Sequence, residues 1–137
     1  MSKVVTMRLA DEQAEALQRL ARRMDRSQGE TAARLVDEAL RMAEYAFITF
    51  RSSIVGRQAY IQGRGLAVWE VIMLLRERSG DVAATAAYLQ WPLAQVQAAV
   101  NYARAFPDDI ADALADNDSY SAEKVSAMLP QTRVVDL

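Results

Sequence analysis

The stretch that decides the fold is residues 3–43, which read KVVTMRLADEQAEALQRLARRMDRSQGETAARLVDEALRMA. If residues 4–9 are extended, three apolar side chains share one face of the strand: Val5, Met7 and Leu9. From residue 11 the apolar spacing becomes helical and predicts two amphipathic helices with a break at residues 25–27. Ser27 followed by Glu30 is the pattern of a capping box, which predicts the start of the second helix. Residues 3–43 therefore predict one strand followed by two helices.

A single strand of six residues is unstable in water, because its backbone N–H and C=O groups need a hydrogen-bonded neighbour. The residues that follow are helical, so no second strand lies close by in the sequence. We therefore expect residues 4–9 to pair with the same strand of a second chain, as an antiparallel ribbon across a two-fold axis. Val4, Thr6 and Arg8 then face outward. Such a ribbon fits the major groove of DNA, where Arg reads guanine and Thr contacts a base edge or the thymine methyl.

With strand, helix, capped turn and helix in this order and without gaps, residues 3–43 resemble the ribbon-helix-helix family of bacterial repressors and antitoxins, the CopG, Arc and MetJ type. The resemblance implies an intertwined homodimer that binds operator DNA and represses transcription. Val4 is apolar where the family often has a polar or basic side chain. A helix N-terminus binds anions, so backbone N–H groups near Ser27 are expected at a phosphate. The DNA-binding residues implied in this way are Lys3, Val4, Thr6, Arg8, Ser27 and Gln28.

The sequence after residue 44 predicts a second, mostly helical domain. Residues 45–66 are rich in aromatic, β-branched and glycine residues, which is typical of short strands or a hairpin. Helical patterns follow at 68–75, at 82–89 after an Asp81 cap, at 93–105 with Pro92 in the first turn, and within the acidic residues 108–118. The predicted fold class is mostly α, a ribbon-helix-helix followed by a small helix-turn-helix-like domain with a short β-hairpin. We expect three segments: 1–44, 45–118, and a C-terminal tail at 119–137.

Residues 56–107 resemble a small bacterial domain frequently found in VapB-type antitoxins. Arg64 stands where that domain usually has Thr. The motifs that carry the resemblance are Gly56, Ile61-Gln-Gly63, Val68-Trp69, Pro92-Leu-Ala-Gln-Val96 and Ala99-Val-Asn-Tyr102.

The two helices expected at 82–89 and 93–105 suggest a helix-turn-helix, in which the second helix enters a groove of DNA. The side chains available for that contact are Gln95, Gln97, Asn101 and Arg104. This half of the chain is acidic, whereas phosphate attraction requires Lys and Arg, so a protein-binding or structural role is an equal alternative. Trp69 and Trp91 have apolar neighbours and are expected in the core.

The composition argues against chemistry at a metal or nucleophilic centre. The 137 residues include no cysteine and no histidine, which removes thiolate ligands, the commonest general base and the best transition-metal ligands. Asp108, Asp109 and Asp112 are close in sequence, but acidic residues at a helix end are ordinarily capping residues. We expect no enzyme activity, no catalytic or metal site and no cofactor. A chain without a secretory signal or a run of about 20 apolar residues is expected in the cytoplasm.

Charge is distributed unevenly along the chain. Residues 1–67 have a balance of +3 and residues 68–137 a balance of −5, which suggests a different partner for each half. Together with the two resemblances, this predicts an antitoxin of a type II toxin-antitoxin system that represses its own operator and neutralises a PIN-like ribonuclease toxin. An extended tail would reach that toxin's carboxylates through Arg133, Val134 and Val135. The alternatives are a stand-alone ribbon-helix-helix repressor without a toxin, and a dimeric scaffold that binds no DNA.

Overall fold

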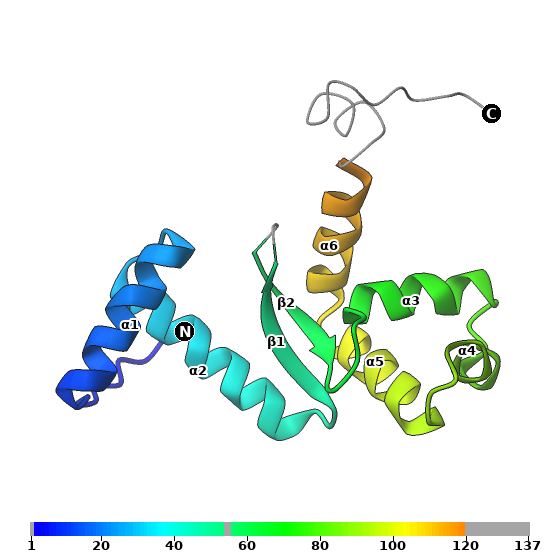
Figure 1. The fold of residues 1–137 in the computed structure, drawn as a ribbon, viewed down its shortest axis with the longest axis horizontal. Coiled ribbons are helices and arrows are strands. Elements are labelled where there is room, and N and C mark those ends of the chain that lie inside the picture. The colour runs from blue at the N-terminus through cyan, green and yellow to red at the C-terminus, as the bar shows by residue number, and fades with distance from the viewer. Residues whose placement is uncertain (1, 54–55, 120–137) are drawn as a thin grey trace. The chain divides into compact units, whose positions relative to one another are not determined.

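The computed structural model describes residues 2–53 and 56–119 (Figure 1). Within these residues the chain forms six helices and two strands, so the protein is mostly helical. It divides into two compact units, Met1–Glu44 and Tyr45–Leu137. The boundary lies at the predicted end of the N-terminal segment.

The N-terminal unit contains α1 (Asp11–Met24) and α2 (Gln28–Glu44), which pack against each other. Helix α1 ends where Asp25 adopts a left-handed conformation with a φ of 53°. The Ser27 cap predicted at the start of α2 is confirmed, but the Glu30 carboxylate accepts from the Ser27 hydroxyl and not from its backbone N–H. The backbone N–H of Glu30 donates to the Ser27 hydroxyl at 3.1 Å, and this hydroxyl donates to the Glu30 carboxylate at 3.1 Å. Side-chain hydrogen bonding of this kind occupies an N–H that the first turn otherwise leaves without a partner.

Residues 2–10 lie ahead of α1 in neither a helix nor a strand (Figure 1). The strand predicted over residues 4–9 is therefore absent from the single chain. A strand is defined by its hydrogen-bonded neighbour, and the two described strands, at 48–53 and 56–61, pair with each other. Pairing of residues 4–9 with a second chain stays a prediction.

The C-terminal unit opens with the predicted hairpin. Strands β1 (Ile48–Ser53) and β2 (Gly56–Ile61) pair antiparallel, with Ile48 opposite Ile61 and Ser53 opposite Gly56. Four helices follow: α3 (Val68–Glu77), α4 (Val82–Leu89), α5 (Leu93–Ala105) and α6 (Pro107–Ser119).

The ends of these helices follow the predicted signals with one correction. The Asp81 carboxylate accepts the Ala84 N–H at 3.0 Å and so caps α4, as expected. Pro92, predicted in the first turn of α5, is instead the residue that caps it. Pro107 both ends α5 and opens α6, because a proline has no N–H to continue one helix but fits the first position of another.

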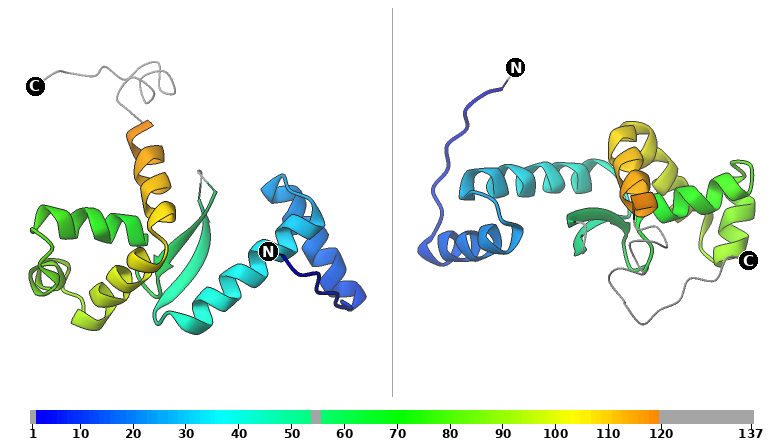
Figure 2. Two further views of the ribbon diagram at one scale, coloured as in Figure 1. Left: turned by 180° about the vertical axis from the view of Figure 1, so that it is seen from behind. Right: turned by 90° about the horizontal axis from the view of Figure 1, so that it is seen from above.

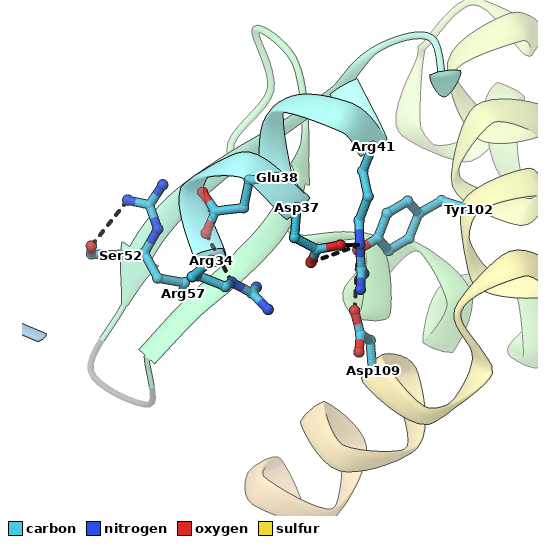
Figure 3. A network of polar contacts seen from close by, with 8 residues as sticks. All are labelled: Arg34, Asp37, Glu38, Arg41, Ser52, Arg57, Tyr102 and Asp109. Atoms are coloured by element: carbon cyan, nitrogen blue, oxygen red, sulfur yellow. Dashed lines mark hydrogen bonds and ion pairs between the residues drawn. The ribbon is translucent and has the colours of Figure 1, made fainter. Parts of the chain in front are cut away.

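Helix α5 is the central element of the C-terminal unit and contacts α3, α4, α6 and both strands (Figure 2). Its residue Tyr102 is 1% exposed, and the Tyr102 hydroxyl donates to Asp109 at 3.2 Å (Figure 3). Leu93, the first residue of α5, is 56% exposed. The buried core side chains include Ile48, Phe50, Ile61, Val68, Val71, Ile72, Val96 and Val100.

The two tryptophans lie at the border of this core rather than inside it, which corrects the prediction. Both are half-buried. The indole N–H of Trp69 donates to the Gln58 side chain at 3.2 Å, and the guanidinium of Arg64 lies over the ring of Trp91. An indole has an apolar body and one polar group, so the border between core and solvent satisfies both.

Candidate dimer and nucleic-acid interface

The predicted DNA-reading side chains all lie on the segment that precedes α1. Lys3, Val4, Thr6 and Arg8 are exposed, and Val4 is 93% exposed. Arg8 forms no ion pair with any described carboxylate, since the described ion pairs involve other cations. Its guanidinium is therefore available to an external acceptor.

The alternate residues of this segment expose apolar side chains. Val5, Met7 and Leu9, which share a face when the segment is extended, are 81%, 61% and 41% exposed. Burial of a side chain of this size is worth about 1.5–3 kcal/mol relative to exposure. Three such residues on a six-residue segment form an apolar face that the described residues of the single chain leave largely exposed.

Helix α2 presents a second exposed apolar surface. Val36 and Leu40, one helical turn apart, are 45% and 64% exposed. At 100° per residue they share a face with small apolar residues and with no charged one. This α2 face comprises Ala32, Val36, Ala39, Leu40 and Ala43.

The charged residues of α2 lie on its other sides and pair with each other. Nε of Arg34 is 2.9 Å from the Glu38 carboxylate, and Nε of Arg41 is 3.1 Å from that of Asp37 (Figure 3). Both pairs link residues four apart, which are neighbours along a helix surface. The charges of α2 are thus kept away from the apolar α2 face.

The N-terminal unit has almost no core of its own. In residues 2–44, Ala21 is the one apolar residue that is buried. The other buried residues of this unit, Thr31 and Glu38, are polar, so burial of apolar surface offsets little of the conformational entropy that its 44 residues lose on folding.

The start of α2 is open to an anion. Gln28 and Gly29 are the first residues of the helix, where backbone N–H groups have no intrahelical partner. Both residues are exposed, and a Cβ placed on Gly29 would meet no atom within 4 Å apart from its chain neighbours and the backbone of its own helix. The neighbouring Arg26 pairs with Glu30 at 3.4 Å. The predicted phosphate position near Ser27 and Gln28 is thus accessible.

Replacing Ser27 with Ala should destabilise the N-terminal unit, because the Glu30 N–H loses its acceptor. We expect a loss of about 1 kcal/mol in the free energy of unfolding, the usual cost of removing an N-cap side chain. Chemical denaturation monitored by circular dichroism measures it, with Ser27→Asp as the matched control that restores an acceptor. Equal stability of the Ala variant and the wild type would show that the cap contributes nothing.

The polar residues that were expected to place α5 in a second groove are only partly available. Gln95 accepts a hydrogen bond from Nε of Arg64 at 2.9 Å, and the Gln97 amide donates to Asn101 at 3.0 Å. Arg104 is exposed. Because α5 is surrounded by five other elements, it presents only a narrow exposed strip. The predicted tail residues Arg133, Val134 and Val135 lie outside the described residues.

The apolar spacing of residues 28–44 predicted an amphipathic helix, and the α2 face follows from that spacing. Sequence reasoning missed a pair of arginines, Arg51 and Arg64, that lie over aromatic rings in the C-terminal unit. The signal for this pair was the absence of Asp and Glu from residues 45–69.

Comparison with known proteins finds no family model, no curated protein and no solved structure that matches this chain. The two resemblances stated above therefore stay predictions. Among the residues that the structure describes, no three Asp or Glu side chains gather in a way that could hold a metal ion. No helix in the same part of the chain has the length and apolar character needed to cross a membrane.

Proposed function

We propose that this chain is a cytoplasmic, homodimeric DNA-binding antitoxin whose N-terminal unit forms half of a ribbon-helix-helix. The observation that carries the proposal is the exposed apolar surface of a unit in which Ala21 is the one buried apolar residue among residues 2–44. One face of residues 4–9 and one face of α2 are both uncharged and exposed. A second copy supplies matching surfaces to both, since a two-fold interface uses the same patch on each chain.

In the proposed dimer the two 4–9 segments pair as antiparallel strands. This pairing satisfies their backbone hydrogen bonds and turns Val5, Met7 and Leu9 toward the α2 faces of both chains. Thr6 and Arg8 then lie on the outer face of the ribbon, doubled by symmetry. A two-stranded ribbon enters the major groove, where a guanidinium binds the O6 and N7 atoms of guanine.

Phosphate contacts at the start of α2 fix the ribbon in register. Backbone N–H groups at a helix N-terminus hydrogen-bond an anion, and the helix dipole favours its charge. Contacts of this kind position a protein on the duplex, whereas base contacts choose the sequence. In the proposed division of roles, Gln28 and its neighbours position the protein on the duplex, and Thr6 and Arg8 recognise the base sequence.

The partner proposed for the C-terminal half is a PIN-like ribonuclease toxin. Residues 68–137 have a balance of −5, and a nuclease is basic where it binds RNA, so the two surfaces are complementary in charge. Binding by this half leaves the N-terminal dimer free to repress the operator. The toxin contact includes the C-terminal tail.

Two measurements on the full chain test this function. We expect a gel-shift with the DNA upstream of its own gene, and co-purification of a small nuclease encoded next to it. Promoter binding without any co-purified partner would identify a stand-alone repressor. A stable dimer that binds neither DNA nor a nuclease would overturn the proposal and leave a scaffold.

A further inference from the structure

A second surface with the properties of a phosphate-binding site lies on the hairpin side of the C-terminal unit. It consists of Arg51, Tyr60, Arg64 and Trp91, and is called here the arginine–aromatic surface. The guanidinium of Arg51 lies 4.8 Å from the ring centre of Tyr60, and that of Arg64 lies 5.2 Å from that of Trp91. Each arginine is thus paired with one aromatic ring.

Both guanidinium groups are also fixed by a hydrogen bond. Nη2 of Arg51 donates to the backbone carbonyl of Arg64 at 3.0 Å, and Nε of Arg64 donates to the Gln95 side chain at 2.9 Å. A guanidinium has five N–H donors, so each arginine keeps several donors for a further acceptor. Stacking and one hydrogen bond hold the planar group in place, which lowers the entropy lost when it binds a ligand.

The charge of these two arginines is not neutralised within the described residues. Neither forms an ion pair there, whereas Arg78, which also lies over a ring, is 3.7 Å from the Glu77 carboxylate. Residues 45–69 contain three arginines and no Asp or Glu, and the acidic residues of this unit begin at Glu70. The hairpin side is therefore basic in a unit that is acidic elsewhere.

We propose that the arginine–aromatic surface binds the phosphate backbone of DNA, as a second contact in addition to the N-terminal ribbon. The proposal rests on the proposed DNA-binding function. Phosphate is favoured over the carboxylates of a protein partner because of where the two arginines lie in the sequence. Both belong to residues 1–67, which have a balance of +3 and include the DNA-reading segment, whereas residues 68–137 have a balance of −5. A planar guanidinium binds phosphate through two parallel N–H donors.

This contact differs in kind from base readout. Phosphates are present in every sequence, so Arg51 and Arg64 add affinity and salt dependence but no sequence preference. The phosphate contact also replaces the groove contact that was expected of α5. Gln95 accepts a hydrogen bond from Arg64 and so holds that side chain rather than reaching a base.

The test compares the full-length wild type with the double variant Arg51→Gln/Arg64→Gln. The probes are two fluorescent duplexes of about 30 base pairs, one from the DNA upstream of the gene and one with that sequence scrambled, titrated between about 50 and 200 mM salt. Because two phosphate contacts per chain are lost, we expect both duplexes to bind at least about ten-fold more weakly at 50 mM salt, with a smaller loss at 200 mM. The slope of log K against log salt is negative, and its magnitude should fall by about two per chain.

Two control variants distinguish this role from a structural one. Arg78→Gln removes an arginine that also lies over an aromatic ring, that of Tyr88 in α4, and should leave both affinities unchanged. Helix α4 lies at the end of the unit away from the hairpin (Figure 1). Arg51→Lys/Arg64→Lys keeps the charge but not the planar group, and should recover most of the affinity and the salt slope. If the Gln and Lys variants both bind weakly and both unfold at a lower temperature than the wild type, the arginines support the fold and the proposal is wrong.

The remaining outcomes are also decisive. Unchanged affinity of the Gln variant, while Arg8→Ala loses its preference for the upstream duplex, would overturn this inference and leave the proposed function standing. Unchanged DNA affinity with weaker binding of poly-glutamate would assign the surface to a carboxylate-bearing protein partner. Failure of the wild type to bind either duplex would overturn the proposed function and this inference together.

Discussion

Replacing Leu40 with Glu is expected to convert the dimer into a monomer and to weaken DNA binding more than 100-fold. Leu40 is 64% exposed in the single chain and lies on the uncharged α2 face. In the proposed dimer this face is covered, and the two-fold axis brings one carboxylate from each chain into the new core. Burying an unpaired carboxylate costs several kcal/mol, which exceeds what a small dimer tolerates.

Sedimentation equilibrium at several concentrations measures this effect, with Leu40→Met as the matched control. The Met variant keeps the apolar volume and should remain a dimer, since such an exchange usually costs less than about 1.5 kcal/mol. A Glu variant that keeps both the dimer mass and its DNA affinity would show that the α2 face is not the interface.

The second large effect is expected from Arg8→Ala, which should abolish sequence-specific DNA binding and leave the dimer intact. Arg8 is exposed, has no described carboxylate partner and lies on the opposite face of the segment from Met7 and Leu9. One arginine–guanine contact is worth about 1–3 kcal/mol, and symmetry removes two of them. The expected loss is therefore roughly 30-fold to more than 1000-fold.

Fluorescence anisotropy with the upstream duplex measures the Arg8 effect, and light scattering measures the assembly. Arg8→Lys keeps one positive charge and should bind DNA of any sequence nearly as well, but with less preference for the upstream duplex. If Arg8→Ala binds that duplex as tightly as the wild type, or becomes a monomer, the ribbon does not read DNA in the proposed way.

Much of the fold follows from local signals in the sequence. The break before α2, its Ser27 cap, the Asp81 cap and the hairpin are all in the predicted places. Each depends on contacts between residues close in sequence, so each is encoded where it occurs. The Pro92 signal was correct to within one residue for the same reason.

Features that depend on distant residues could not be predicted in this way. Helical spacing shows which residues of α5 are apolar, but not that five elements surround it and that Gln95 is held by Arg64. The positions of Trp69 and Trp91 depend likewise on Gln58 and Arg64, which lie at least eleven residues away. Residues 4–9 are the extreme case, because their expected partner is another molecule.

The most direct test of the central proposal is the distance between the two 4–9 segments in solution. The chain has no cysteine, so Thr6→Cys places a single spin label on the outer face of the ribbon, and Arg19→Cys on α1 provides the control. Neighbouring strands are about 4.8 Å apart and rise about 3.3 Å per residue, so an antiparallel ribbon predicts labels at position 6 separated by roughly 5–15 Å. Labels at Arg19 should be farther apart. Absence of any coupling between chains labelled at position 6, at concentrations where the protein is fully assembled, would contradict the ribbon.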